Sequence, residues 1–136
     1  MVDCIFCKII AGEIPSAMLI ETERVVSFLD VGPVNPGHAL VVPTRHVESF
    51  LDLSQDELHT AAFMAQRVAR AVAQATGSPG FNVLLNKDEC AGQLVPHVHF
   101  HVIPRRPDDG YAMGWRQLPY AEGEAERMAD AIRGCL

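Results

Sequence analysis

The sequence lacks the features that mark membrane, secreted and nucleic-acid-binding proteins. It has no apolar run long enough to span a bilayer, and residues 1–4 contain neither the basic segment nor the apolar stretch of a secretion signal. The 11 lysines and arginines are outnumbered by 17 aspartates and glutamates, and the net charge of −6 excludes an extended nucleic-acid surface, which needs clustered basic residues. We therefore expect a cytoplasmic protein with no membrane or nucleic-acid partner.

Cysteine is also scarce, with only Cys4, Cys7, Cys90 and Cys135 in the chain. A disulfide framework is not expected from four cysteines in a reducing compartment. The Cys4-x-x-Cys7 spacing is typical of half a metal site, although two buried apolar thiols would give the same pattern.

The 136 residues fit a single domain, residues 1–136, and 49% of them are hydrophobic, which is enough for a core. The pattern predicts a short helix at residues 4–10 and strands at 17–20, 25–29, 38–42, 81–86 and 97–103. A long helix should begin at the capping box Ser54 to Glu57 and stop at Gly77. A terminal helix is expected at 121–132, with Met128, Ala131 and Ile132 packing. Short strand connections favour an antiparallel α+β fold.

Three of the six histidines lie within five residues, where His97, His99 and His101 alternate with Val98, Phe100 and Val102. On a strand, this period of two places the imidazoles on one face and the apolar residues on the other. A solvated edge strand has no need of three histidines. Two chemical interpretations remain open at this point: the imidazoles bind a metal ion, or one of them is a nucleophile.

A tetrahedral zinc site needs four ligands, and Cys4, Cys7, His46 and one strand histidine would supply them. The spacing does not decide which strand histidine that is. Such a closed site is structural, because it would fasten the N-terminal helix to the sheet and leave His99 free for chemistry. His59 lies inside the long helix and is interpreted as a surface or packing residue.

The seven residues from His97 to Ile103 resemble the signature of the histidine triad (HIT) family, in which three histidines alternate with apolar residues and two apolar residues follow. The resemblance extends to residues 4–9, 28–30, 36–38, 43–46, 82–86 and 92–93. It points to the small bacterial-type, zinc-containing nucleotide-binding branch.

The resemblance implies a HIT-like fold, an antiparallel sheet of about five strands with helices, usually paired as a homodimer. It implies that His99 is the nucleophile, that His101 contacts the α-phosphate and assists departure, and that His38 completes the histidine cluster. It also implies that His97 joins Cys4, Cys7 and His46 around a structural Zn²⁺ that takes no part in the chemistry.

The resemblance likewise implies a pocket for a purine nucleotide of the AMP or GMP type. Asp30 would accept hydrogen bonds from the ribose, and Phe6, Ile9 and Phe28 would pack around the base. Asn86 and the backbone of Gly92 and Gln93 would approach the phosphate. The sequence departs from the family at Leu94, where many relatives have a serine or threonine hydroxyl.

These residues predict a hydrolase or transferase that acts at the nucleoside α-phosphate through a covalent nucleotidyl-histidine. Nucleoside phosphoramidates and dinucleoside polyphosphates are the expected substrate types. One alternative is a nucleotide-binding protein with little or no turnover, for which Leu94 is the support. The others are a zinc hydrolase that uses all three strand histidines and a zinc-stapled interaction module.

Overall fold

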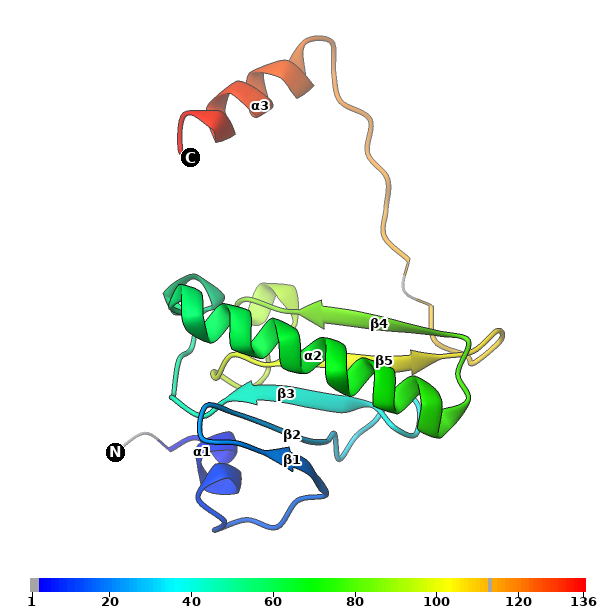
Figure 1. Ribbon diagram of the computed structural model, residues 1–136. Helices are drawn as coiled ribbons and strands as arrows, with labels where there is room; N and C mark the ends of the chain where they lie inside the picture. The colour runs from blue at the N-terminus through cyan, green and yellow to red at the C-terminus, as the bar shows by residue number, and fades with distance from the viewer. Residues whose placement is uncertain (1–2, 113) are drawn as a thin grey trace.

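The computed structural model describes residues 3–112 and 114–136, and it contains one five-stranded antiparallel sheet with helices (Figure 1). The strand order is β1-β2-β3-β5-β4, and the strands are Met18–Glu21, Val25–Leu29, Ala39–Pro43, Gly80–Leu85 and Phe100–Arg105 for β1 to β5. The predicted α+β class and the sheet of about five strands are confirmed. The interpretation of Met1 and Val2 as free of a secretion signal lies outside the described residues.

The helices are α1 (Ile5–Ile10), α2 (Gln55–Thr76) and α3 (Glu124–Arg133), with short 3-10 turns η1 at Phe50–Asp52 and η2 at Glu89–Ala91. Helix α2 begins as predicted, because the Ser54 hydroxyl accepts a hydrogen bond from the Glu57 N–H while the Glu57 carboxylate accepts one from the Ser54 N–H. It ends at Gly77, whose φ of 65° is left-handed. No helix in the described part of the chain is long and apolar enough to cross a membrane.

The sheet is covered on both faces at its centre. Val25, Ala39 and Val41 pack with the apolar stripe of α2, while their neighbours Val26 and Leu40 pack with residues of the α1 segment. This alternation follows from the period of two along a strand, because successive side chains point to opposite faces. The central strands are therefore buried almost throughout, and the two cores lie on opposite sides of one sheet.

The histidine segment differs from the prediction of a strand at residues 97–103. Strand β5 begins at Phe100, because the Val98 N–H donates to the Val47 carbonyl at 2.7 Å and this bond draws the preceding residues out of the sheet. The strand also runs through Pro104 to Arg105. Beyond Val102 it pairs with β4 alone, so one side of the strand is open and the missing N–H of Pro104 is tolerated there.

The C-terminal helix forms, but the prediction that it packs is wrong within this chain. An extended arm, residues 106–123, carries α3 away from the sheet (Figure 1). None of the α3 residues is buried, and Met128 and Ile132 are 48% and 54% exposed.

We predict that Gly37→Ala destabilises the fold by about 2–4 kcal/mol, whereas Gly12→Ala costs about 1 kcal/mol. Both glycines have a positive φ, 98° and 77°, but only at Gly37 does an added Cβ meet another group, the Thr76 methyl at 2.7 Å. Urea denaturation of the two variants measures the difference. Equal losses would show that the contact between Gly37 and the end of α2 is unimportant.

Candidate active site and metal centre

The histidines fall into two groups around α1 and β5. His46 and His97 lie beside the two N-terminal cysteines, whereas His38 and His101 lie beside Asp30. The ring of His99 lies 4.9 Å from that of His101. His59 is exposed on α2, as expected for a surface residue.

The first group brings together four metal-ligating atoms. Cys4 is the N-cap of α1 and Cys7 lies in its first turn, so both thiols face the same side. The His97 Nδ1 atom lies 3.4 Å from the Cys4 Sγ and 3.7 Å from the Cys7 Sγ, and the His46 Nδ1 lies 3.4 Å from the Cys7 Sγ. Zinc bonds of about 2.0–2.3 Å give tetrahedral edges of about 3.3–3.8 Å. These donors therefore fit a tetrahedral metal ion.

The orientation of the His97 ring supports the same arrangement. Its Nε2 lies 2.8 Å from the Pro43 carbonyl oxygen, which can only accept, so the proton is on Nε2 and the Nδ1 lone pair faces the cysteines. The His46 Nε2 lies 3.5 Å from the Glu48 carboxylate. Partners of this kind on the far ring nitrogen orient metal-binding histidines. The structure thus groups His97, and neither of the other two triad histidines, with Cys4, Cys7 and His46.

His99 has the opposite orientation and contacts none of those four donors through a hydrogen bond described in this structure. Its Nδ1–H donates to the His97 carbonyl at 2.7 Å, which leaves the Nε2 lone pair without a proton when the ring is neutral. Burial lowers the pKa of His99, because the charged imidazolium loses its hydration. At neutral pH the ring is therefore an uncharged base with one fixed tautomer.

The tautomer of His101 follows from a chain of hydrogen bonds. The Val34 N–H donates to the His38 Nδ1 at 3.1 Å, so the neutral His38 has its proton on Nε2. That proton is donated to the His101 Nδ1 at 2.9 Å, and the neutral His101 therefore carries its own proton on Nε2. Burial, assisted by repulsion from His99 and His38, lowers the pKa of His101 to about 4. Burial also lowers the pKa of His38.

His99 and His101 line a cavity of about 290 Å³, near the lower end of the range for small-molecule sites. The cavity has one apolar side and one polar side. The sequence-predicted residues that line it are Phe6, Ile9, Phe28, Asp30, Gly92, His99 and His101. Sequence reasoning missed Ile14, Pro15 and Ser16, which return to the cavity after the turn at Gly12. The only signal for them is the Gly-x-x-Pro break itself.

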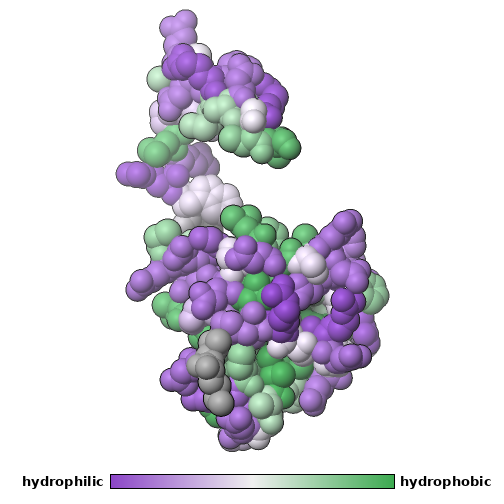
Figure 2. Space-filling view, turned by 90° about the vertical axis from the view of Figure 1, so that its left-hand side faces the viewer, coloured by the Kyte–Doolittle hydropathy of each residue, from purple (hydrophilic) through white to green (hydrophobic). Residues whose placement is uncertain are grey.

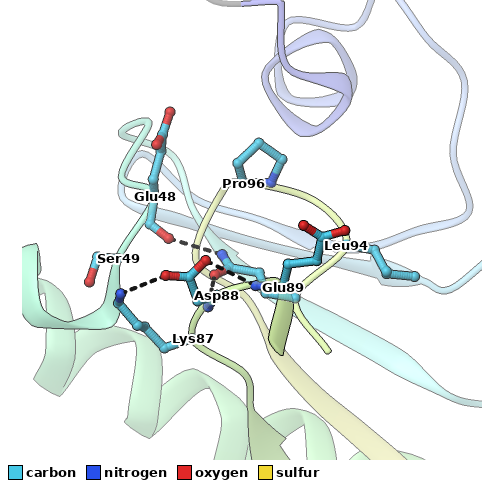
Figure 3. Close-up of a pocket in the computed structure, with 8 residues that line it drawn as sticks. Glu48, Ser49, Lys87, Asp88, Glu89, Leu94 and Pro96 are labelled. Carbon is cyan, nitrogen blue, oxygen red and sulfur yellow. Dashed lines mark hydrogen bonds and ion pairs between the residues drawn. The ribbon is translucent and has the colours of Figure 1, made fainter. Parts of the chain in front are cut away.

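Two predicted nucleotide contacts do not line this cavity. The Gln93 side chain accepts from the Asp88 N–H at 2.7 Å and donates to the Glu48 carbonyl at 2.9 Å, which fixes the loop of residues 87–93 (Figure 3). The Asn86 side chain lies 3.4 Å from the Gly92 carbonyl. Both residues therefore shape the loop that borders the cavity. Leu94 is 86% exposed and lies between this cavity and the neighbouring one drawn in Figure 3.

Comparisons with known proteins agree with this geometry. A family model described as the HIT domain matches residues 11–108. The sequence is 37% identical over 130 residues to an adenosine 5'-monophosphoramidase from Schizosaccharomyces pombe, with 95% of each chain covered. The fold is similar to that of a HIT family protein from Bacillus subtilis, with a TM-score of 0.93 and 37% identity over 99% of this chain and 98% of that one. It is also similar to a zinc-bound histidine triad family protein from Mycobacterium smegmatis, with a TM-score of 0.76 and 31% identity over 98% and 95% of the two chains.

We predict that the purified chain contains about one tetrahedrally bound metal ion, and that Cys7→Ser removes most of it and lowers the melting temperature. The substitution removes one thiolate ligand from the cluster at the N-terminus of α1. Elemental analysis by plasma mass spectrometry and a thermal melt measure the two effects. Cys90→Ser is the matched control, because Cys90 is exposed and distant from the cluster in sequence. Undiminished metal content in Cys7→Ser would contradict the assignment.

Proposed function

The chain belongs to the HIT-domain family, and we propose that it is a nucleotide hydrolase that acts at the nucleoside α-phosphate through His99. One observation carries the proposal: a buried, neutral His99, with its Nε2 lone pair free, lines a cavity that also contains a carboxylate and a second imidazole. An imidazole in that state is a nucleophile at neutral pH. The name of the yeast relative, an adenosine 5'-monophosphoramidase, supports nucleoside phosphoramidates as the substrate class.

In this proposal the apolar side of the cavity binds a purine between Phe6, Ile9 and Phe28. The Asp30 Oδ1 already accepts a hydrogen bond from the Gly32 N–H at 2.9 Å, so the Oδ2 is the atom that accepts from the ribose hydroxyls. Asn86 and the backbone of Gly92 and Gln93 approach the phosphate from the bordering loop. Gly92 has a φ of 96°, and an added Cβ would meet the Asn86 amide at 3.3 Å, which supports a need for glycine there.

The reaction then has two displacements at phosphorus. The His99 Nε2 attacks the α-phosphorus in line, a P–N bond to the imidazole forms, and the P–N bond to the leaving amine breaks. His101, with its proton on Nε2, stabilises the phosphoryl oxygens or protonates the leaving nitrogen. His38 holds His101 in that tautomer. Water then attacks the phosphorus, releases the nucleoside monophosphate and restores neutral His99.

Leu94 favours a second candidate, a protein that binds nucleotides with little turnover. A hydroxyl at this position would be a further proton donor for the leaving group, and leucine removes it. We favour the enzyme, because the His101 Nε2–H is a donor that does not depend on residue 94.

Zinc is the metal that we propose for the Cys4, Cys7, His46 and His97 site, and its role is structural. The support is the two-thiolate, two-imidazole donor set and the zinc-bound relative from Mycobacterium smegmatis. Four protein ligands leave no open position for substrate, so the ion would hold α1 against the sheet without entering the reaction. Reduced thiolates at this site also support a cytoplasmic location.

A homodimer is the proposed assembly. Strand β4 is at the edge of the sheet, and its neighbourhood exposes large apolar side chains, with Phe63 at 62%, Phe81 at 48% and Val83 at 45%. A cavity of about 620 Å³ lies between α2 and β4, and alanines on α2 leave room for close approach. A second copy that pairs its own β4 with this edge would cover these side chains and close the assembly by two-fold symmetry.

We predict that His99→Ala lowers kcat on an adenosine 5'-phosphoramidate by at least about 1,000-fold while AMP binding stays within a few-fold of wild type. Liquid chromatography of the products and isothermal titration with AMP measure the two quantities. His59→Ala is the control, because His59 is exposed on α2. Unchanged turnover in His99→Ala would exclude it as the nucleophile, and AMP binding without turnover in the wild type would favour the second candidate.

A second prediction concerns pH. His101 and His38 act as neutral rings in this mechanism, and the pKa of His101 is lowered to about 4, so the active state persists below the ordinary histidine pKa. We expect kcat/KM to remain flat from pH 8 to below pH 6 and to fall only as the pH approaches about 4 to 5. Circular dichroism at each pH checks that the protein is still folded. A fall centred on pH 6.5 would mean that the histidine cluster is not shielded from solvent.

A further inference from the structure

The arm that carries α3 is fixed at its root. The Arg105 guanidinium donates to both oxygens of Asp109 at 2.7 and 3.0 Å and to the Asn82 side chain at 2.9 Å, while Asn35 donates to Asp109 at 2.9 Å. Arg105 also lies over the Tyr111 ring, 4.9 Å from its centroid. This cluster joins the start of the arm to β4 and β5. The arm consequently leaves the domain in a set direction, beyond the β4 edge (Figure 1).

Helix α3 is amphipathic and has no core of its own. Ala125, Met128, Ala129 and Ile132 recur at three- and four-residue steps and form one apolar stripe. Figure 2 shows hydrophobic residues along the side of the α3 lobe that faces the rest of the chain, across an open gap, and polar residues on the outer side. The stripe therefore looks back toward the β4 edge but contacts nothing there.

The chain also has an apolar groove that is not occupied in this structure. It lies between α2 and the first two strands, has a volume of about 490 Å³, and is lined by Leu19, Ile20, Leu29, Met64, Arg67 and Ala71. Leu19 is 47% exposed. None of the ion pairs among residues 3–112 and 114–136 involves Arg67, so the groove has a cation at its border without an anionic partner.

We propose that α3 of one copy docks in this groove of a second copy. The inference rests on the dimer proposed above, in which the two β4 edges meet. In that arrangement the groove of the partner lies on the far side of its sheet, because the strand order places β1 and β2 farthest from β4. The second copy fills the gap that α3 faces, and the arm clasps it.

Charge and length both fit this occupant. The outer positions of α3 include Glu126 and Asp130, and the preceding residues add Glu122 and Glu124, so an acidic helix would meet the unpaired Arg67 of the partner subunit. Residues 106–123 can extend to roughly 50–60 Å at up to about 3.3 Å each. Five strands at about 4.8 Å spacing span only about 20–25 Å, so the arm is long enough to cross a whole partner sheet.

Site-directed cross-linking tests the proposal in the full chain. Two differently tagged versions are co-expressed, both with Cys90→Ser and Cys135→Ser, one with Ala71→Cys in the groove and the other with Ile132→Cys on the apolar stripe. Mild oxidation should join the two tags in most molecules, as seen by intact mass on a non-reducing gel. Ala131→Cys, which lies off the stripe, replaces Ile132→Cys as the matched control and should cross-link several-fold less.

Two other outcomes would overturn the proposal. If Ala71→Cys and Ile132→Cys on one polypeptide link only within that chain, α3 occupies its own groove; if neither arrangement links, the groove is not its site. Light scattering on a sizing column separates this failure from failure of the dimer itself. A wild-type monomer refutes the β4 pairing, whereas a wild-type dimer without the cross-link refutes only the docking of α3. In the docked dimer, Ile132→Asp should raise the dimer dissociation constant at least tenfold, and Ala131→Asp should change it less than threefold.

Discussion

The hydrogen bond from the His99 ring to the His97 backbone carbonyl joins the two halves of the site. His97 offers its side chain to the cysteine cluster and its main chain to the neighbouring catalytic candidate. Because a carbonyl oxygen only accepts, the bond fixes both the orientation and the tautomer of His99. Anything that holds the His97 backbone in place, including the bond between Val98 and Val47 and the metal-ligating atoms of α1, therefore acts on the lone pair that faces the cavity.

Much of the fold follows from local signals in the sequence. The capping box at Ser54, the apolar stripe of α2 and the stop at Gly77 are consistent with one another, and that helix has the predicted bounds. Strand β2 was also predicted at its observed residues. The start of β5 was not, because it depends on a hydrogen bond to Val47, a residue fifty positions away, that no local periodicity contains. Likewise the exposed stripe of α3 could not be distinguished from a packing stripe, since the pattern is the same whichever chain covers it.

The site shows the same division. Alternation along residues 97–102 and the family resemblance together indicate which residues to consider, but period two alone assigns all three imidazoles to one face. The bend at His97 separates that ring from the other two, and the choice of His97 for the cysteine cluster is visible only in three dimensions. Gln93 illustrates the opposite case, because its side chain closes a loop through two main-chain hydrogen bonds and does not enter the cavity. The roles of these residues in binding and catalysis stay predictions.

The complete burial of β3 has a consequence for how this protein can change over generations. All five of its residues, Ala39–Pro43, are enclosed by side chains above and below and by strands to left and right, so the strand has no solvent-facing position. Neutral drift needs positions where a new side chain can be accommodated, and here every replacement must fit a space already filled. Divergence among descendants of this gene should therefore be concentrated at the margins of the sheet, while its middle strand keeps nearly the same volume at each position.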